Sequence, residues 1–115
     1  MNNPSRIIIF VAAVLLNAVI AHAADGQQLY TTNCASCHGA DGKGRTPAGK
    51  KLGARDLTQS KLTDAEIEKQ IVVGTSDAKG NSRMPSFQAV LQPDDIAPLV
   101  AYVNTLRHGS GVSGK

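Results

Sequence analysis

The chain is short and weakly charged, with 115 residues, a formal net charge of +3 and 3% aromatic residues. So small a charge, with so few aromatic rings to stack on bases, argues against nucleic-acid binding. The only two cysteines, Cys34 and Cys37, stand three positions apart, so no disulfide framework holds the chain together. The composition fits one small domain with a limited capacity to bury apolar surface.

Residues 1–23 are predicted to be a secretory signal peptide. Arg6 precedes an apolar run over residues 7–20, and small residues up to Ala23 suit cleavage after that position. An uncleaved membrane anchor is the alternative, but the run is shorter than the roughly 20 residues that span a bilayer. No cysteine stands at the cleavage point, so no lipid anchor is expected. We therefore expect residues 24–115 to form a soluble, periplasmic domain without stable membrane insertion.

A first helix is predicted from Asp25 to Asn33, with Asp25 near its cap. Gly26 and Tyr30 are four positions apart and share one face of this helix. Because a glycine inside a short helix costs up to about 1 kcal/mol, a packing reason is expected, namely a second helix that crosses close to Gly26. The alternative is that Gly26 only frays the helix end.

The next five residues, Cys34 to His38, indicate covalent haem attachment. Two cysteines three positions apart on a short helical segment have Cβ atoms roughly 5–6 Å from each other, so both thiols can add to the vinyl groups of one porphyrin. His38 follows Cys34 by four positions and lies on nearly the same face, where its imidazole can bind the iron. In so small a domain the haem would be a principal part of the core. We therefore expect the chain without haem to be largely unfolded.

Other uses of the cysteine pair are less well supported. A dithiol redox centre requires a neighbouring βαβ pattern, and no strand pattern surrounds the motif. A structural zinc requires four ligands, and His22 and His108 are the only further histidines in the chain. A disulfide between residues 34 and 37 would close a very short loop and leave His38 without a role.

Residues 39–62 are predicted to be irregular, because they are rich in glycine and lysine and have no sustained periodicity. Their basic residues indicate a local positive surface: Lys43, Arg45, Lys50, Lys51 and Arg55. Such a surface can steer an acidic redox partner. A solvated loop without a partner is the commoner meaning of such a run.

A second helix is predicted from Thr63 to Gly74. Thr63 at the N-cap and Glu66 at N3 form a capping box, and Leu62 with Ile67 forms a hydrophobic staple across it. Gly74 is typical of a helix end. We expect this helix to be a wall of the haem pocket.

Residues 75–86 are polar and turn-prone, and they contain Met84, the only methionine left after removal of the signal peptide. An isolated methionine usually fills a gap in a core. Here a loop position, together with an iron already held by His38, favours Met84 as the second axial ligand. A thioether is a soft ligand that raises the reduction potential of haem iron.

A third helix is predicted from Pro93 to His108, with an apolar stripe made of Ile96, Leu99, Val100, Val103 and Leu106. Pro93 suits the first turn, whereas Pro98 is expected to kink the helix. His108 is interpreted as a surface residue at the helix end rather than an iron ligand.

The set of Cys34, Cys37, His38 and Met84, flanked by helices at both ends, resembles the class I c-type cytochromes, in particular the small bacterial mono-haem members. The resemblance covers nearly all of the chain after the signal peptide. It implies an all-α fold, the small cytochrome c fold, in which three to four helices wrap around one haem c. The haem is then covalently attached through Cys34 and Cys37, and the terminal helices cross.

Two structural details are also implied by this resemblance. Gly26 and Tyr30 on the first helix are similar to the family's crossing residues, as are Leu99 and Tyr102 on the last helix. In the family, a proline carbonyl in the loop after the motif accepts a hydrogen bond from the ligand histidine. Pro47 is the candidate for that role in this chain.

The expected function is outer-sphere transfer of single electrons, because iron bound by both His38 and Met84 has no open site for a substrate. Neither catalytic residues nor an enzymatic activity are expected. The predicted partners of this monomeric carrier are redox proteins, with a reductase or dehydrogenase as donor and an oxidase or reaction centre as acceptor. Two alternatives remain: a haem c subunit or relay of a larger oxidoreductase, and a ligand-binding or peroxidatic haem protein in which Met84 is labile.

Overall fold

The computed structural model of the chain describes residues 25–107, which form five α-helices, one 3-10 helix and a two-stranded antiparallel sheet. The predicted signal peptide, His22 and His108 lie outside the described residues. In chain order the elements are α1 (Gly26–Asn33), α2 (Ala35–His38), α3 (Pro47–Leu52), η1 (Leu57–Gln59), α4 (Asp64–Val73), β1 (Thr75–Ser76), β2 (Ser82–Met84) and α5 (Pro93–Arg107).

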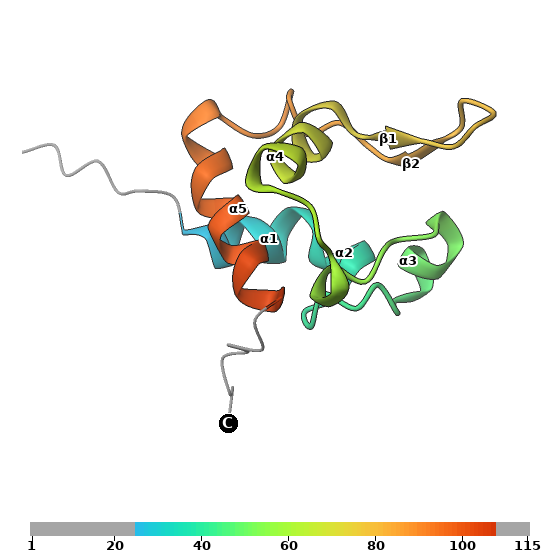
Figure 1. Cartoon of the computed structure of the whole chain (residues 1–115), viewed down its shortest axis with the longest axis horizontal. Coiled ribbons are helices and arrows are strands. Elements are labelled where there is room, and N and C mark those ends of the chain that lie inside the picture. Colours follow the sequence, from blue (N-terminus) through green and yellow to red (C-terminus); the bar gives the residue numbers. More distant parts are fainter. Residues whose placement is uncertain (1–24, 108–115) are drawn as a thin grey trace, which may run out of the picture.

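The terminal helices α1 and α5 cross, as predicted (Figure 1). A Cβ atom on Gly26 would collide with the backbone carbonyl of Pro98 and lie 3.2 Å from the Cβ of Tyr102. Tyr30 and Leu99 are fully buried, and the rings of Tyr30 and Tyr102 have centroids 5.1 Å apart. Gly26 is therefore needed because two helix backbones approach each other there. Pro98 does not end α5, which continues to Arg107.

The predicted helix caps are also confirmed. The Asp25 carboxylate accepts a hydrogen bond from the Gln27 amide at 3.0 Å and starts α1. At α4, the Thr63 amide donates to the Glu66 carboxylate at 2.7 Å, and the Glu66 amide donates to the Thr63 hydroxyl at 3.3 Å. Gly74 ends α4 with a φ of 79°. These short-range hydrogen bonds fix the ends of both helices.

The hydrophobic core is small. Within residues 25–107 no polar or charged side chain is fully buried, and the buried apolar residues come from α1, α4, α5 and the segments beside them. They are Tyr30, Cys34, Ile67, Ile71, Leu91, Leu99, Val100 and Val103. One of the two cysteines of the predicted attachment motif is thus a member of the core.

The stretch between α2 and α4 is more ordered than the sequence suggested. The prediction of an irregular segment over residues 39–62 was wrong for α3 and η1, which lie within it. Thr46 caps α3 by accepting a hydrogen bond from the Gly49 amide at 2.9 Å, Pro47 occupies its first turn, and Gly53 ends it with a φ of 71°. A helix of only six residues is too short to show a periodic apolar pattern.

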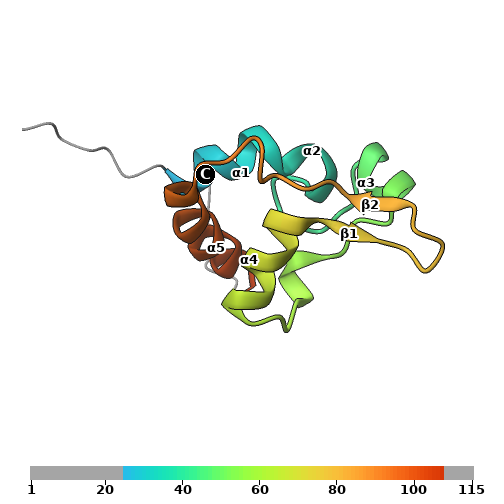
Figure 2. The ribbon, with the colours of Figure 1, turned by 90° about the horizontal axis from the view of Figure 1, so that it is seen from above.

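The segment before α5 also differs from the prediction. β1 and β2 form a hairpin in which Thr75 pairs with Met84 and Ser76 pairs with Ser82. Met84 is therefore the last residue of a strand and not part of an irregular loop. The tip of the hairpin projects away from the helices in both views (Figures 1 and 2).

Candidate haem-binding site

The two cysteines of the motif form no disulfide; Cys34 lies between α1 and α2, and Cys37 lies within α2. Cys34 follows the last residue of α1 and precedes α2, and its amide donates to the Tyr30 carbonyl at 2.8 Å. Cys34 is buried and Cys37 is half-buried. In the chain before haem is attached, burial, followed by the charge of Cys37, raises the pKa of the Cys34 thiol to about 11. The two cysteines that would form the predicted thioether bonds thus lie at or beside the hydrophobic core.

His38 is oriented by a backbone carbonyl. Its Nδ1 atom lies 3.1 Å from the carbonyl oxygen of Arg55. A carbonyl can only accept, so Nδ1 must carry the proton and donate it, which leaves the Nε2 lone pair available to a metal. Burial lowers the pKa of His38 and the hydrogen bond to Arg55 opposes this only in part, so the neutral ring is favoured. The neutral imidazole is the form that binds iron.

The expectation that Pro47 supports His38 was wrong. Pro47 occupies the first turn of α3, and the acceptor is Arg55, which comes after that helix. The reason is the unpredicted α3, which takes up residues 47–52 and returns the chain to His38 only beyond Gly53. Because every residue has a backbone carbonyl, the residue that accepts this hydrogen bond cannot be identified from the sequence.

A second set of contacts holds the backbone of the motif. The Thr46 hydroxyl donates to the carbonyl of Ser36 at 2.7 Å and lies 3.0 Å from the carbonyl of Cys37. Gly49 packs on the same Cys37 carbonyl so closely that a Cβ atom there would collide with it. Helix α3 therefore lies directly against α2.

The backbone just after His38 is also held. The buried Tyr30 hydroxyl donates to the Gly39 carbonyl at 2.6 Å, and the Gly44 amide donates to the His38 carbonyl at 2.8 Å. Gly39 and Gly44 both have positive φ angles, of 79° and 68°. Because other residues rarely adopt these angles, the glycines allow the chain to turn back towards the motif.

Met84 reaches the same apolar cluster from the other end of the chain. Its half-buried side chain packs against the core cluster of which Cys34 is a member. Gly74, at the end of α4, lies so close to the Met84 carbonyl that a Cβ atom there would be 2.5 Å from the oxygen. The structure thus brings Cys34 and Met84 into one cluster, although 49 residues separate them in the chain.

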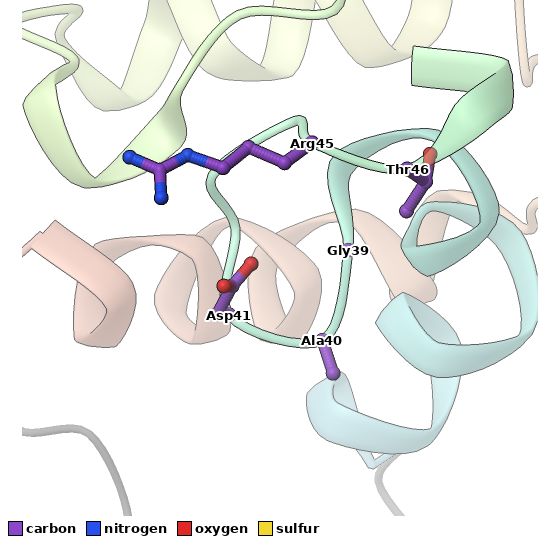
Figure 3. Close-up of a pocket in the computed structure, with 5 residues that line it drawn as sticks. All are labelled: Gly39, Ala40, Asp41, Arg45 and Thr46. Atoms are coloured by element: carbon purple, nitrogen blue, oxygen red, sulfur yellow. The ribbon is translucent and has the colours of Figure 1, made fainter. Parts of the chain in front are cut away.

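An open pocket of about 320 Å³ lies on the loop after the motif (Figure 3). Its lining residues are Gly39, Ala40, Asp41, Arg45 and Thr46. None of the two cysteines, His38 or Met84 lines it, so this pocket is a surface feature of the loop rather than the cofactor site.

Between residues 25 and 107 no cluster of three or more histidine, cysteine or carboxylate side chains could hold a metal ion. None of the helices in that range has the length and apolar character needed to cross a bilayer.

The sequence model of the family described as Cytochrome c matches residues 23–107, which is most of the chain. The chain belongs to the cytochrome c family. Cytochrome c6 from Nostoc sp. is 34% identical over 97 residues, covering 84% of this chain and 82% of that protein. The solved KustC0563 c-type cytochrome has a TM-score of 0.63 and 34% identity, covering 73% of this chain and 99% of that one.

A longer relative is the cbb3-type cytochrome c oxidase subunit FixP from Azorhizobium caulinodans. It is 33% identical over 84 residues, which are 73% of this cytochrome c but only 27% of FixP. The domain therefore also occurs as a part of longer subunits.

The expected fold class and cofactor are confirmed by this family membership. The structure is mostly helical with two short strands, consistent with the cytochrome c fold, and the cofactor of the family is covalently bound haem c. Electron transport through a haem c is accordingly the general activity of this chain. The axial ligands, the individual attachment residues and the redox partners stay predictions.

Proposed function

We propose that this cytochrome c is a freely diffusing one-electron carrier whose haem is attached through Cys34 and Cys37 and whose iron is bound by His38 and Met84. The haem supplies an iron centre that gains or loses a single electron without a change in bonding. The observation that carries the proposal is the hydrogen bond from His38 Nδ1 to the Arg55 carbonyl, because it leaves Nε2 as the free ligand atom.

The position of Met84 supports the second half of the proposal. Its half-buried thioether side chain packs against the apolar cluster to which Cys34 belongs, and a thioether is a soft, uncharged ligand suited to haem iron. If His38 and Met84 both bind the iron, no coordination position would remain for an exogenous ligand or for peroxide. This favours electron transfer over ligand binding or peroxidatic chemistry.

The axial ligand is tested by replacing Met84 with alanine and, separately, with leucine. We expect both variants to lose the ferric absorption band diagnostic of a methionine–iron bond, to have a lower reduction potential and to bind carbon monoxide rapidly in the ferrous state. Met84→Leu is the control for packing, because it keeps the apolar volume and lacks only the sulfur. An unchanged spectrum and potential in Met84→Leu would exclude Met84 as a ligand.

The attachment and the export can be measured on the same preparation. The pyridine haemochrome spectrum of the exported protein should be that of a haem with two thioether bonds, and Cys34→Ser should shift it towards that of a single bond. The mass of the exported chain should correspond to residues 24–115 plus one haem. An intact residue 1–23 segment in the purified protein would contradict the proposed cleavage and periplasmic location.

The proposed redox partner presents an acidic surface to the positively charged residues between Lys43 and Arg55. Lys50 and Lys51 form the last turn of α3, and both side chains are exposed. Neutralising both with glutamine should slow electron transfer with an acidic partner and flatten the salt dependence of its rate. The matched control is Lys69→Gln with Lys79→Gln, which removes the same charge from α4 and the hairpin. Equal salt slopes for the two double variants would exclude docking at α3.

The likeness to FixP supports one second candidate, a haem c subunit of a larger oxidoreductase. Size-exclusion chromatography and pull-down from the native source separate the two cases. A free carrier elutes at the mass of a monomer, whereas a subunit is recovered with a stable partner in fixed stoichiometry.

A further inference from the structure

The hairpin that ends at Met84 is too short to be held by its own backbone. β1 has two residues, β2 has three, and the register between them shifts after Thr75. An isolated two-stranded hairpin is at best marginally stable in water, and this one projects from the body of the molecule (Figures 1 and 2). Another interaction must therefore hold the two strands together.

The carboxylate of Asp77 supplies that interaction. Its Oδ1 accepts from the backbone amides of Lys79 and Asn81, each at 2.9 Å. Its Oδ2 accepts from the Asn81 side chain and from the Arg83 guanidinium, each at 3.0 Å. The Asp77 amide also donates to the Asn81 carbonyl at 2.9 Å, so one residue closes the turn and binds the second strand.

The contact between Asp77 and Arg83 acts next to the predicted ligand. Arg83 immediately precedes Met84 in β2, and its ion pair with Asp77 adds to the strand pairing a side-chain link between β2 and the residue that follows β1. Beyond Met84, the Ser86 hydroxyl donates to the Val72 carbonyl at 2.5 Å and anchors the chain to α4. Met84 is thus held from one side by α4 and from the other side by Asp77.

We propose that Asp77, acting through Arg83, is a positioning residue that holds Met84 in place for the iron. This inference rests on the proposed ligation by Met84. Without the carboxylate, the strand before Met84 loses its charged anchor, and the side chain samples positions away from the iron. Asp77 does not touch the cofactor, so its effect must appear in how easily another ligand displaces Met84.

The test measures the affinity of the ferric haem protein for imidazole, which competes with Met84 for the iron. Asp77→Asn is expected to bind imidazole roughly two- to fivefold more tightly than the parent, the change that corresponds to a partly exposed ion pair. Arg83→Gln should have the same effect, and Arg83→Lys should lie between Arg83→Gln and the parent, because it keeps the charge but not the planar fork.

The matched control is Asp25→Asn, which removes one carboxylate at the start of α1, away from the hairpin. We expect it to leave the imidazole affinity unchanged. If Asp77→Asn binds imidazole no more tightly than the parent while Met84→Ala does, the positioning role is excluded and the ligation stands. If both aspartate variants change the affinity equally, the effect is general destabilisation and the positioning role is excluded as well. If Met84→Ala leaves affinity and spectrum unchanged, the ligation and the positioning role both fall.

Discussion

The two predicted iron ligands are held in different ways. Contacts from three segments hold His38 and the backbone beside it: the Tyr30 hydroxyl of α1 donates to the Gly39 carbonyl, the Thr46 hydroxyl just before α3 donates to carbonyls of α2, and the Arg55 carbonyl accepts from the His38 ring. Each of these contacts joins the motif to a segment that is itself packed in place. The histidine side of the site is therefore fixed by several independent interactions.

Fewer contacts hold Met84. It ends a short hairpin whose tip is held by the Asp77 carboxylate, and the Arg83 side chain in the ion pair is 48% exposed. Exposed ion pairs are weakened by water and by salt. We therefore expect Met84, rather than His38, to dissociate first from the iron. Substitutions on the histidine side should instead lower the stability of the whole fold.

Removal of the haem should have the largest effect, because both halves of the site pack against one small core. The chain with both Cys34 and Cys37 replaced by alanine is expected to be largely unfolded. Burial of about 250 Å² of haem surface contributes on the order of 6 kcal/mol, a large share of the stability of a small domain. Circular dichroism and thermal melting measure this, and a compact, cooperatively melting form without haem would contradict it.

Gly49→Ala should be the next most damaging change. Its Cβ would collide with the Cys37 carbonyl and separate α3 from α2. Alanine favours the helix by about 1 kcal/mol, but overpacking against a backbone atom should outweigh this and give a net loss of roughly 1–3 kcal/mol. The free energy of unfolding from urea titration of the haem protein tests it.

The control for this change is Gly53→Ala at the end of the same helix. Gly53 has a φ of 71° and no atom within 4 Å of an added Cβ, so only the backbone strain of about 1 kcal/mol is expected. A loss no larger for Gly49→Ala than for Gly53→Ala would show that α3 is not packed tightly on the motif.

Tyr30→Phe should lower the stability by about 1–2 kcal/mol, because it leaves the Gly39 carbonyl without its buried donor. Tyr102→Phe is the matched control, since its ring packs on Tyr30 and its hydroxyl has no hydrogen bond to any residue between 25 and 107. The methionine–iron band of Tyr30→Phe should be unchanged. If Tyr30→Phe lost the methionine–iron band but kept the stability of the parent, the histidine side would not act mainly on the stability of the fold, and the proposed difference between the two ligands would be wrong.

The smallest effect concerns pH and the start of α4, the helix that leads into the hairpin. Hydrogen bonds from the Thr63 amide and then from its hydroxyl lower the pKa of Glu66 below its ordinary value of 4.5. The carboxylate therefore stabilises the folded state above that value, and this contribution is lost as the pH falls through the lowered pKa. Glu66→Gln should flatten the decline of the melting temperature between about pH 5 and pH 3. An identical decline in both proteins would exclude the capping box as its cause.

Much of the site could be predicted because it depends on local chemistry. Cys34, Cys37 and His38 are close in the chain, so their common face follows from helix geometry alone. The capping box of Thr63 and Glu66 spans three residues and forms wherever a helix begins. Gly26 indicated a close helix crossing because a glycine in that place is costly without one.

The order of residues in the chain was thus enough to predict an attachment motif, the starts of the longer helices and the family to which the chain belongs. Helix α3 carries local signals that the sequence already holds, namely Thr46 at its N-cap, Pro47 in its first turn and Gly53 at its end, whereas the contact of Gly49 with the Cys37 carbonyl exists only in the folded chain. The folded structure was also needed to show that Arg55 rather than Pro47 orients His38 and that Asp77 binds Arg83 beside Met84. For Gly49 and His38 the partner is a backbone carbonyl brought near by the fold, and because every residue has a carbonyl, the sequence does not reveal which one it will be.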